Sequence, residues 1–371
     1  MHLPLLRQGL EQGIEDGLHL GAQVYISLQG QVLAYWALGE AKADVPLRED
    51  SLMLWLSSSK PIAAVAIAQL WERGALDLDD RVVQYIPEFG AHGKEAITLR
   101  HVLTHTGGFR SRIDLGWGEE TWDKTLEQIC AARLERDWYP GRKAAYHINS
   151  GWFVLGEVVR RLDGRPYEQY AREEIFAPAG MTDTWFVLSR EQYETYGERL
   201  CPVYDTSAEG IKEVEFWNEV SGSSRCIPGA SGRGCMRDLG RFYEMIFHKG
   251  VGRQGQRLLA PQTVDTLTAR HRVGLFDETF KHVMDWGLGF VANSTLYGVE
   301  SVPYGYGRHA SPRTFGHSGQ QSSVGFADPD CGLVVAMAVN GMPGAGRHHK
   351  RFLELNSAIY EDLGLTVPLQ E

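Results

Sequence analysis

The sequence lacks the segments that would place a protein in or on a membrane. None of its apolar runs approaches the ~20 residues that span a bilayer, and the first residues lack the sustained apolar core of a secretory signal. It also lacks basic runs, and the net charge is −10 over 371 residues, so nucleic acid and anionic membrane surfaces are disfavoured as partners. We therefore expect a soluble, cytoplasmic protein.

The sequence also contains little cysteine, in a pattern that indicates reduced thiols more than a disulfide framework or a zinc site. Its five cysteines are odd in number and scattered, with no Cys-x-x-Cys pair, which is typical of reduced thiols. His101 and His105 have the spacing of a zinc-binding helix pair, but Val102 stands where a metalloprotease has glutamate. His348 and His349 lie at the start of a basic helix and are expected at the surface. We therefore expect no metal and no other cofactor. The cysteines are Cys130, Cys201, Cys226, Cys235 and Cys331.

Strand patterns occur near both ends of the chain, and helical patterns lie mainly between them. Residues 23–28 and 31–38 alternate in polarity around Gln29-Gly30, which predicts a hairpin. Near the other end, three short apolar runs bounded by turn residues predict strands at 313–319, 322–327 and 333–340. Helical spacing of apolar residues is found at 4–18, 121–136, 150–162 and 347–363.

This order of elements predicts an α/β fold of the α+β type. An antiparallel sheet is built from both chain ends and flanked by helices, and a mainly helical insertion lies between. A chain of 371 residues with 43% hydrophobic residues can fill more than one domain. We predict a discontinuous sheet domain formed by 1–60 and 270–371, and a helical domain formed by 61–269. The active site is expected at their interface.

The stretch 52–74 combines a buried helix with a nucleophile and a base. The serines at 57–59 are candidates for the helix N-cap, and Gly74 is a natural stop after the last turn. Ser57 and Lys60 are three residues apart and so share one face of the first turn. A buried lysine can be neutral and take the serine proton, and the helix N-terminus favours a developing oxyanion.

Four segments together carry a resemblance to a known family. In chain order they are Ser57-Ser-Ser-Lys60, Leu103-Thr-His-Thr-Gly-Gly108, Pro140-Gly141 followed by Tyr146, and Phe315-Gly-His317-Ser-Gly319. A Ser-x-x-Lys match alone is common by chance, but this ordered set, spread over roughly 23–340, resembles the serine β-lactamase and penicillin-binding protein superfamily. The resemblance is to its class C-like branch of family VIII-type esterases, D-amino-acid peptidases and β-lactamase-fold acyltransferases. It implies a serine β-lactamase-like fold.

The resemblance implies that Ser57 is the nucleophile and Lys60 its base partner. The third motif of the family, Lys-Thr-Gly in typical β-lactamases, is His317-Ser-Gly319 here. The N–H of Gln320 would join that of Ser57 in an oxyanion hole. Histidine is only partly protonated near neutral pH, so it would hold a substrate carboxylate more weakly than lysine does. This difference favours the esterase and transacylase branch over true β-lactamases.

The second motif of the family, Tyr-x-Asn, leaves an ambiguity in this chain. The corresponding segment reads Tyr146-His147-Ile148-Asn149, and counting back from Gly156 places His147 at the tyrosine position. A phenol and an imidazole can both move protons. We favour Tyr146 for this role, with His147 as the alternative and Asn149 as a further candidate. Weaker candidates for an acyl pocket are Trp117, Trp152 and Trp286.

These residues predict a serine acyl-transfer enzyme that forms a covalent acyl-Ser57 intermediate on a small ester or amide, as a carboxylesterase does. One alternative is a transacylase that passes the acyl group to an amine or alcohol in natural-product biosynthesis. An alternative of another class is a non-catalytic module that binds an acyl or peptide ligand. Gly316-His-Ser-Gly-Gln320 also nearly matches the nucleophile elbow of α/β-hydrolases, with Gln320 in place of the last glycine. The acyl donor, the acceptor and the oligomeric state stay open.

Overall fold

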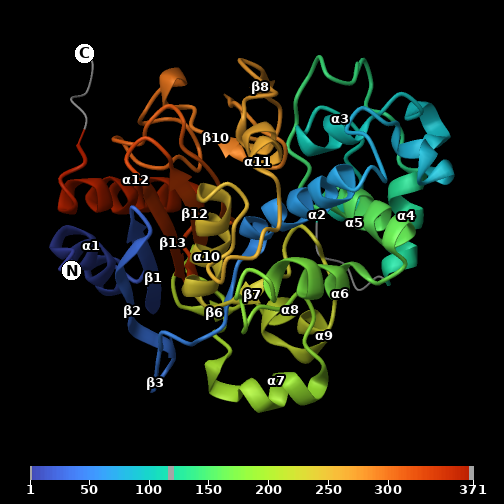
Figure 1. Cartoon of the computed structure of the whole chain (residues 1–371). Coiled ribbons are helices and arrows are strands. Elements are labelled where there is room, and N and C mark those ends of the chain that lie inside the picture. Colours follow the sequence, from blue (N-terminus) through green and yellow to red (C-terminus); the bar gives the residue numbers. More distant parts are fainter. Residues whose placement is uncertain (1, 116–120, 367–371) are drawn as a thin grey trace.

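Both ends of the chain contribute strands to one antiparallel sheet (Figure 1). In the computed structural model, which describes residues 2–115 and 121–366, this sheet has seven strands in the order β10-β11-β12-β13-β1-β2-β3. Three strands come from the N-terminal end and four from the C-terminal end, which confirms the predicted fold class. The sheet strands are β1 (Gly21–Leu28), β2 (Gln31–Lys42), β3 (Val45–Pro46), β10 (Val291–Ala292), β11 (Phe315–Gly319), β12 (Ser323–Asp328) and β13 (Leu333–Val339). Shorter strands outside it are β4 (Met53–Leu54), β5 (Tyr204–Asp205), β6 (Lys212–Glu213), β7 (Arg233–Gly234), β8 (Phe276–Asp277), β9 (His282–Val283) and β14 (Gly341–Met342).

The predicted hairpin joins β1 and β2, with Tyr25 opposite Tyr35. Its turn consists of Gln29 and Gly30, whose φ angles of 52° and 77° both lie in the left-handed region. Two successive residues of positive φ form the tight turn that matches the twist of paired strands. The hairpin prediction is therefore confirmed, although β2 continues beyond the predicted end to Lys42.

Most of the chain between β3 and β10 is helix and loop. The helix α2 is apolar almost all round and buried along nearly its whole length, and it packs against α5, α6, α11 and β11. In the part of the chain that the structure describes, no helix is long and apolar enough to cross a membrane. The helices are α1 (Pro4–Glu15), α2 (Lys60–Glu72), α3 (Leu99–Leu103), α4 (Trp122–Ala131), α5 (Ser150–Asp163), α6 (Tyr167–Ala171), α7 (Arg190–Tyr196), α8 (Glu215–Asn218), α9 (Val220–Ser223), α10 (Met236–Phe247), α11 (Pro261–Thr268) and α12 (Ala345–Asp362).

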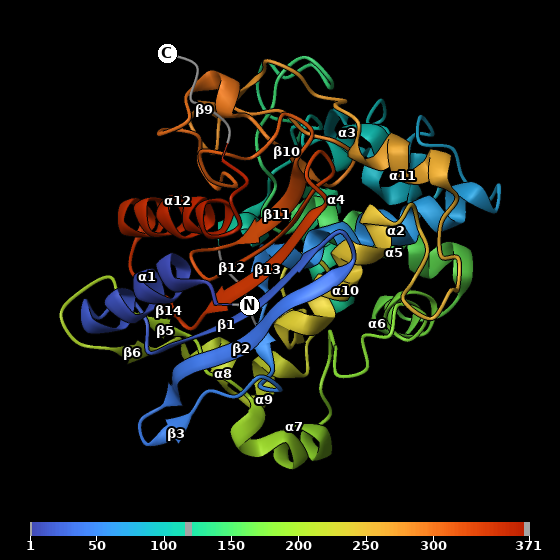
Figure 2. The same ribbon diagram turned by 60° about the vertical axis from the view of Figure 1, so that its left-hand side comes forward.

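Alternate residues of the central strands face two different helical layers. In β13, Val335 packs into a cluster with residues of α1 and α12, whereas Ala336 belongs to the cluster that contains α2 and α10. Figure 2 shows α1 and α12 on one side of the sheet and α10 on the other. This follows from the period of two in a strand, which sends successive side chains to opposite faces. The division into 1–60 with 270–371 and 61–269 stays a prediction.

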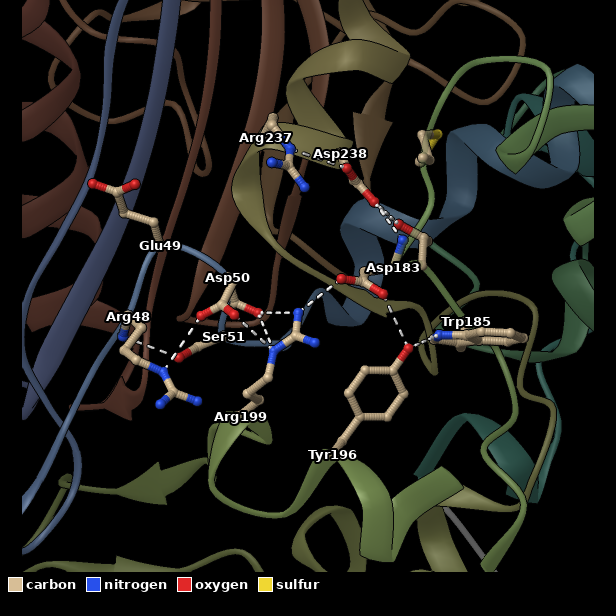
Figure 3. Close-up of polar contacts among 12 residues, drawn as sticks. Arg48, Glu49, Asp50, Ser51, Asp183, Trp185, Tyr196, Arg199, Arg237 and Asp238 are labelled. Carbon is tan, nitrogen blue, oxygen red and sulfur yellow. Dashed lines mark hydrogen bonds and ion pairs between the residues drawn. The ribbon is translucent and has the colours of Figure 1, made fainter. Parts of the chain in front are cut away.

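A polar network anchors the chain just before the serine triplet (Figure 3). Arg199 donates to the backbone carbonyl of Asp50 at 2.8 Å and to Asp183 Oδ2 at 2.7 Å. Tyr196 donates to Asp183 Oδ1 at 3.1 Å, and the Leu52 amide donates to the Arg199 carbonyl at 2.6 Å. Because these charged groups are partly exposed, the ion pair adds little to stability. Its effect is to fix the path of the chain into β4.

His348 is buried, so the expected surface position is wrong for this residue. It is 3% exposed and packs between the rings of Tyr304 and Phe352, with centroid distances of 5.2 Å and 4.5 Å. The reason is that residues four apart share one face of a helix, and Phe352 lies on the core-facing side of α12. His349 is partly exposed.

Candidate active site

Ser57 lies in a short 3-10 turn, η1 (Leu56–Ser59), that leads into α2. The preceding residue, Leu56, has a φ of 49°. A bulky side chain adopts this left-handed conformation only where its surroundings impose it, at a cost of about 1–3 kcal/mol. The backbone strain is therefore located directly beside the candidate nucleophile.

The other two serines of the triplet hold this turn in place. Ser58 Oγ donates to the backbone carbonyl of His317 at 3.1 Å, and Ser59 Oγ accepts from the Gly232 amide at 3.1 Å. Ser59 occupies the N-cap position of α2, but its hydroxyl makes no cap hydrogen bond. The predicted capping role is therefore wrong, because the hydroxyls of Ser58 and Ser59 bind neighbouring segments instead.

Lys60 is placed to act as a base for Ser57. Its Nζ lies 2.8 Å from Ser57 Oγ and donates to the Gly229 carbonyl at 2.9 Å. Its side chain is fully buried, at 0% exposure, and this burial holds the pKa of the Lys60 amine well below its ordinary value, against a smaller opposing effect of Asp114. The direction of this shift favours the neutral amine, which has a lone pair for the serine proton.

Tyr146 reaches the same cavity as Ser57. Its ring lies with its centroid 5.1 Å from Lys60 Nζ and packs against Phe280 at 4.7 Å. Burial raises the pKa of the Tyr146 phenol well above its ordinary value, while its hydrogen-bonding interaction with the Ser57 side chain lowers it. The phenol is therefore held protonated, as a donor and relay more than as a phenolate.

His147 and Asn149 do not line this cavity. The His147 Nδ1 lies 3.1 Å from Ser150 Oγ, and its ring packs on Phe109 at 4.4 Å. Asn149 is buried at the N-cap position of α5, and its backbone N–H donates to Asp114 Oδ1 at 2.7 Å. Of the two candidates for the second motif, the structure therefore brings Tyr146 and not His147 to Ser57.

Two of the candidate tryptophans lie behind the site, and Trp117 lies outside the described residues. Trp152 has its ring 5.6 Å from Lys60 Nζ and donates to the His147 carbonyl at 3.3 Å. Trp286 is fully buried and packs edge-on against His105 at 4.5 Å. Trp152 contributes to the surroundings of the lysine, Trp286 packs on the His105 and Tyr146 rings, and neither lines the cavity.

The third-motif strand β11 packs directly on η1. Its His317 is buried, and its Nδ1 donates to the Ser318 carbonyl at 2.9 Å. Burial, helped by the nearby Lys60, lowers the pKa of His317 to about 3. The expected partial protonation near neutral pH is therefore wrong, because burial in the folded chain disfavours the charged form of the ring.

Only glycine fits at position 319, where β11 ends. A Cβ atom there would lie 2.2 Å from the Trp55 carbonyl oxygen and 2.4 Å from Ser323 Oγ. This close approach brings the amide of Gln320, which follows directly, to the turn that carries Ser57. The predicted oxyanion pair, the amides of Ser57 and Gln320, therefore depends on this glycine.

Replacing Gly319 tests whether the oxyanion hole depends on this glycine. Gly319→Ala is expected to lower kcat by about 10²-fold, because a shift of about 1 Å in a reacting group has that effect. Steady-state ester hydrolysis and thermal unfolding measure the change. The control is Gly346→Ala in α12, where a Cβ meets nothing within 4 Å and activity should be unchanged. Full activity of Gly319→Ala would rule out the proposed oxyanion geometry.

The site opens into a cavity of about 180 Å³ with a mainly apolar and aromatic wall. Ser57, Tyr146, His317 and Gln320 all contribute to its lining. Among the described residues, no charged side chain lines it. The remaining lining residues are Ile148, Thr279, Phe280, Met284, Val291, Tyr304 and Ser318.

Three residues that hydrogen-bond the backbone around the site are not predicted from the sequence: His105, Asp114 and Asp277. Asp114 Oδ1 accepts from the amides at the start of α5, and Asp277 Oδ1 accepts from the Tyr146 amide at 3.1 Å. His105 lies within the motif at 103–108, so a sequence signal for it exists. The two aspartates lie in segments without a clear helix or strand pattern, and no motif marks them.

Comparison with known proteins agrees with this architecture. A crystal structure of a family VIII carboxylesterase matches with a TM-score of 0.81 at 26% identity, covering 97% of each chain. The fold is thus that of the β-lactamase-fold serine hydrolases. The family model described as Beta-lactamase matches residues 6–358, and the chain therefore belongs to the β-lactamase family.

Curated relatives of the chain carry more than one activity in their names. Esterase EstB of Burkholderia gladioli is 28% identical over 369 residues, covering 89% of this chain and 88% of EstB. Penicillin-binding protein PbpX of Bacillus subtilis (strain 168) is 37% identical over 158 residues, which cover 43% of this chain and 37% of PbpX. The matched segment thus spans little more than a third of PbpX. These relatives leave the substrate undefined.

Proposed function

We propose that the protein is a serine acyl-transfer hydrolase that acts as a carboxylesterase on small neutral esters or amides. The observation that carries this proposal is the 2.8 Å contact between Ser57 Oγ and the Nζ of a fully buried Lys60. A neutral amine at hydrogen-bonding distance is the base that a serine nucleophile needs. The similarity to EstB and to the family VIII carboxylesterase supports the esterase reading.

In the acylation step, Lys60 takes the proton of Ser57 and Oγ attacks the carbonyl carbon of the substrate. The amides of Ser57 and Gln320 stabilise the negative charge on the carbonyl oxygen. When the tetrahedral adduct collapses, the bond to the leaving alcohol breaks, and that alcohol receives the proton from Lys60 through the Tyr146 phenol. Water then attacks the acyl-Ser57 ester, gives one proton back to Ser57 through Lys60, and releases the acid.

The cavity selects against a substrate carboxylate. A β-lactamase-type lysine in the third motif would offer a permanent positive charge, but His317 is neutral here and Lys60 is held toward the neutral form. An ionised carboxylate in this apolar cavity would lose its hydration without gaining an ion pair. The wall made by Phe280, Met284 and Val291 instead suits an apolar acyl or aromatic group.

The substrate preference is tested by comparing two acyl donors. Short p-nitrophenyl esters are expected to be hydrolysed, and benzylpenicillin is expected to be turned over slowly or not at all. Both expectations follow because the cavity is mainly apolar and no positively charged side chain of the described residues lines it to bind the penicillin carboxylate. Release of p-nitrophenol and loss of the β-lactam absorbance measure the two rates. Efficient penicillin turnover, at a kcat/KM of ~10⁴ M⁻¹s⁻¹ or above, would contradict the proposal.

The p-nitrophenyl ester assay also separates a hydrolase from a transacylase and from a non-catalytic binding module. In the presence of a primary amine, an amide product would indicate a transacylase, whereas release of free acid alone would indicate a hydrolase. Stoichiometric labelling of Ser57 without turnover would indicate a binding module instead. Ser57 and Tyr146 line one cavity and Lys60 contacts Ser57 from behind it, and this grouping favours the enzyme over that module.

A further inference from the structure

Tyr146 lies in a segment without regular secondary structure, so its position depends on other contacts. Residues 145–149 belong to no helix or strand. Three consecutive amides in this segment nevertheless have defined acceptors. The Ala145 amide donates to the His105 carbonyl at 3.0 Å, the Tyr146 amide to Asp277 Oδ1 at 3.1 Å, and the His147 amide to His105 Nδ1 at 3.0 Å. The tyrosine is thus held through its own amide and through those on either side.

His105 provides two of these three acceptors. Its φ of 57° is left-handed, which is uncommon for a residue other than glycine. Its ring lies against the Tyr146 ring with centroids 4.7 Å apart. Burial holds the pKa of His105 well below its ordinary value, so the neutral ring keeps a lone pair on Nδ1. Because Nδ1 accepts from the His147 amide, the ring proton must be on Nε2.

Asp277 provides the third acceptor and links the tyrosine to the cavity wall. Besides the Tyr146 amide, its Oδ1 accepts from the amides of Thr279 at 2.9 Å and Phe280 at 3.1 Å. Its other oxygen, Oδ2, lies 3.1 Å from Arg272, and both side chains are buried. The carboxylate charge is therefore compensated where water cannot reach it.

We propose that His105 is a positioning residue for Tyr146: its Nδ1 acceptor and its ring hold the phenol against Ser57 and Lys60, with Asp277 as the second anchor. The inference rests on the proposed function, in which the phenol relays a proton. His105 is absent from the cavity lining, so it acts only through the tyrosine. Without the imidazole, the His147 amide would lose its acceptor, because the other two amides bind the His105 carbonyl and Asp277, so the ring is needed as more than a space filler.

The test compares two substitutions at this position. His105→Leu removes the acceptor, whereas His105→Asn keeps an acceptor oxygen close to the place of Nδ1 and tolerates a left-handed backbone. We expect His105→Leu to slow acylation of Ser57 by a p-nitrophenyl ester about 10- to 10²-fold, and His105→Asn to retain most of the rate. Stopped-flow bursts measure acylation, and thermal melting shows that each variant is folded.

A double-mutant cycle distinguishes positioning from a general loss of stability. In a Tyr146→Phe background, His105→Leu should cause little further loss, because residues that act through one group are not additive. His101→Leu is the matched control: the same residue type, on the adjoining helix α3, makes a local contact with Thr98 and should leave the acylation rate unchanged. If His105→Leu lowered the acylation rate equally in the wild-type and Tyr146→Phe backgrounds, the proposal would be overturned. A fully active His105→Leu enzyme would overturn it as well.

A crystal structure of His105→Leu separates this inference from the proposed function. The Tyr146 ring should be displaced from its place beside Ser57, whatever the chemical role of the phenol. An undisplaced ring would overturn the inference. A displaced ring together with an active Tyr146→Phe enzyme would support the positioning role and refute the proton relay. If His105→Leu does not fold, His105→Ala, which removes the acceptor without adding bulk, is judged by the same criteria.

Discussion

Ser57→Ala should abolish ester turnover, with a loss of at least about 10⁴-fold in kcat, the order found when a member of a nucleophilic unit is removed. The reason is that alanine removes the oxygen that lies 2.8 Å from Lys60 Nζ, so no acyl-enzyme can form. Steady-state hydrolysis of a p-nitrophenyl ester measures the loss. Mass spectrometry of a trapped reaction should place the acyl group on the peptide that carries Ser57.

The neighbouring serines provide the controls. Ser58→Ala loses a hydrogen bond to the His317 carbonyl but keeps the nucleophile, so it should still form the adduct. Ser318 lines the same cavity and is the serine of the near match to the α/β-hydrolase elbow. Acylation mapped to Ser318 would refute the assignment of Ser57. The structure disfavours that outcome, because Ser318 lies inside strand β11 and not at a turn from a strand into a helix.

Tyr146→Phe is expected to lower kcat about 10²-fold or more, which is typical of losing a general acid–base group. Phenylalanine keeps the ring that packs on Phe280 and His105 but removes the hydroxyl that interacts with Ser57. His147→Gln should be mild, since that side chain bonds Ser150 and does not line the cavity. Parallel kcat and KM measurements on both variants separate proton transfer from substrate binding.

The reverse order of effects would refute the assignment of Tyr146. If His147→Gln strongly lowered kcat and Tyr146→Phe left kcat nearly normal, His147 would be the second-motif residue, as counting back from Gly156 indicates. Since His147 is buried, its variant also requires a melting curve. A lowered melting temperature without a change in kcat would leave Tyr146 as the relay.

The sequence predicts the parts of the site that short-range patterns encode. Ser57 and Lys60 are separated by one turn, so their contact follows from helix geometry. The position of His317 beside them depends on the packing of strand β11 on η1, which the ordered motifs make predictable. The same patterns predict the hairpin around Gly30, because two runs of alternating polarity flank a turn in which glycine readily takes one of the two positive φ angles.

Other parts of the site could not be predicted because they depend on contacts between irregular segments. No periodicity in the sequence distinguishes Tyr146 from His147 as the second-motif residue. Which of the two side chains reaches Ser57 is decided by the groups that accept hydrogen bonds from the backbone of this segment. Asp277 is more than a hundred residues from Tyr146 in the chain, and it ends the two-residue strand β8, which is too short to give a sequence pattern. The neutrality of His317 is likewise a property of burial in the folded chain, which its residue type does not reveal.

The shared anchor at Asp277 has a consequence for protein engineering. The carboxylate binds the Tyr146 amide and, at the same time, the amides of Thr279 and Phe280. Side chains such as Met284 can therefore be randomised to change which acyl groups are admitted, while the reacting groups keep their frame. Whole-loop replacement is a different matter. A grafted loop without this aspartate would change the substrate specificity of the enzyme and at the same time release Tyr146 from its anchor. Mutant libraries should therefore keep the codon for Asp277 fixed.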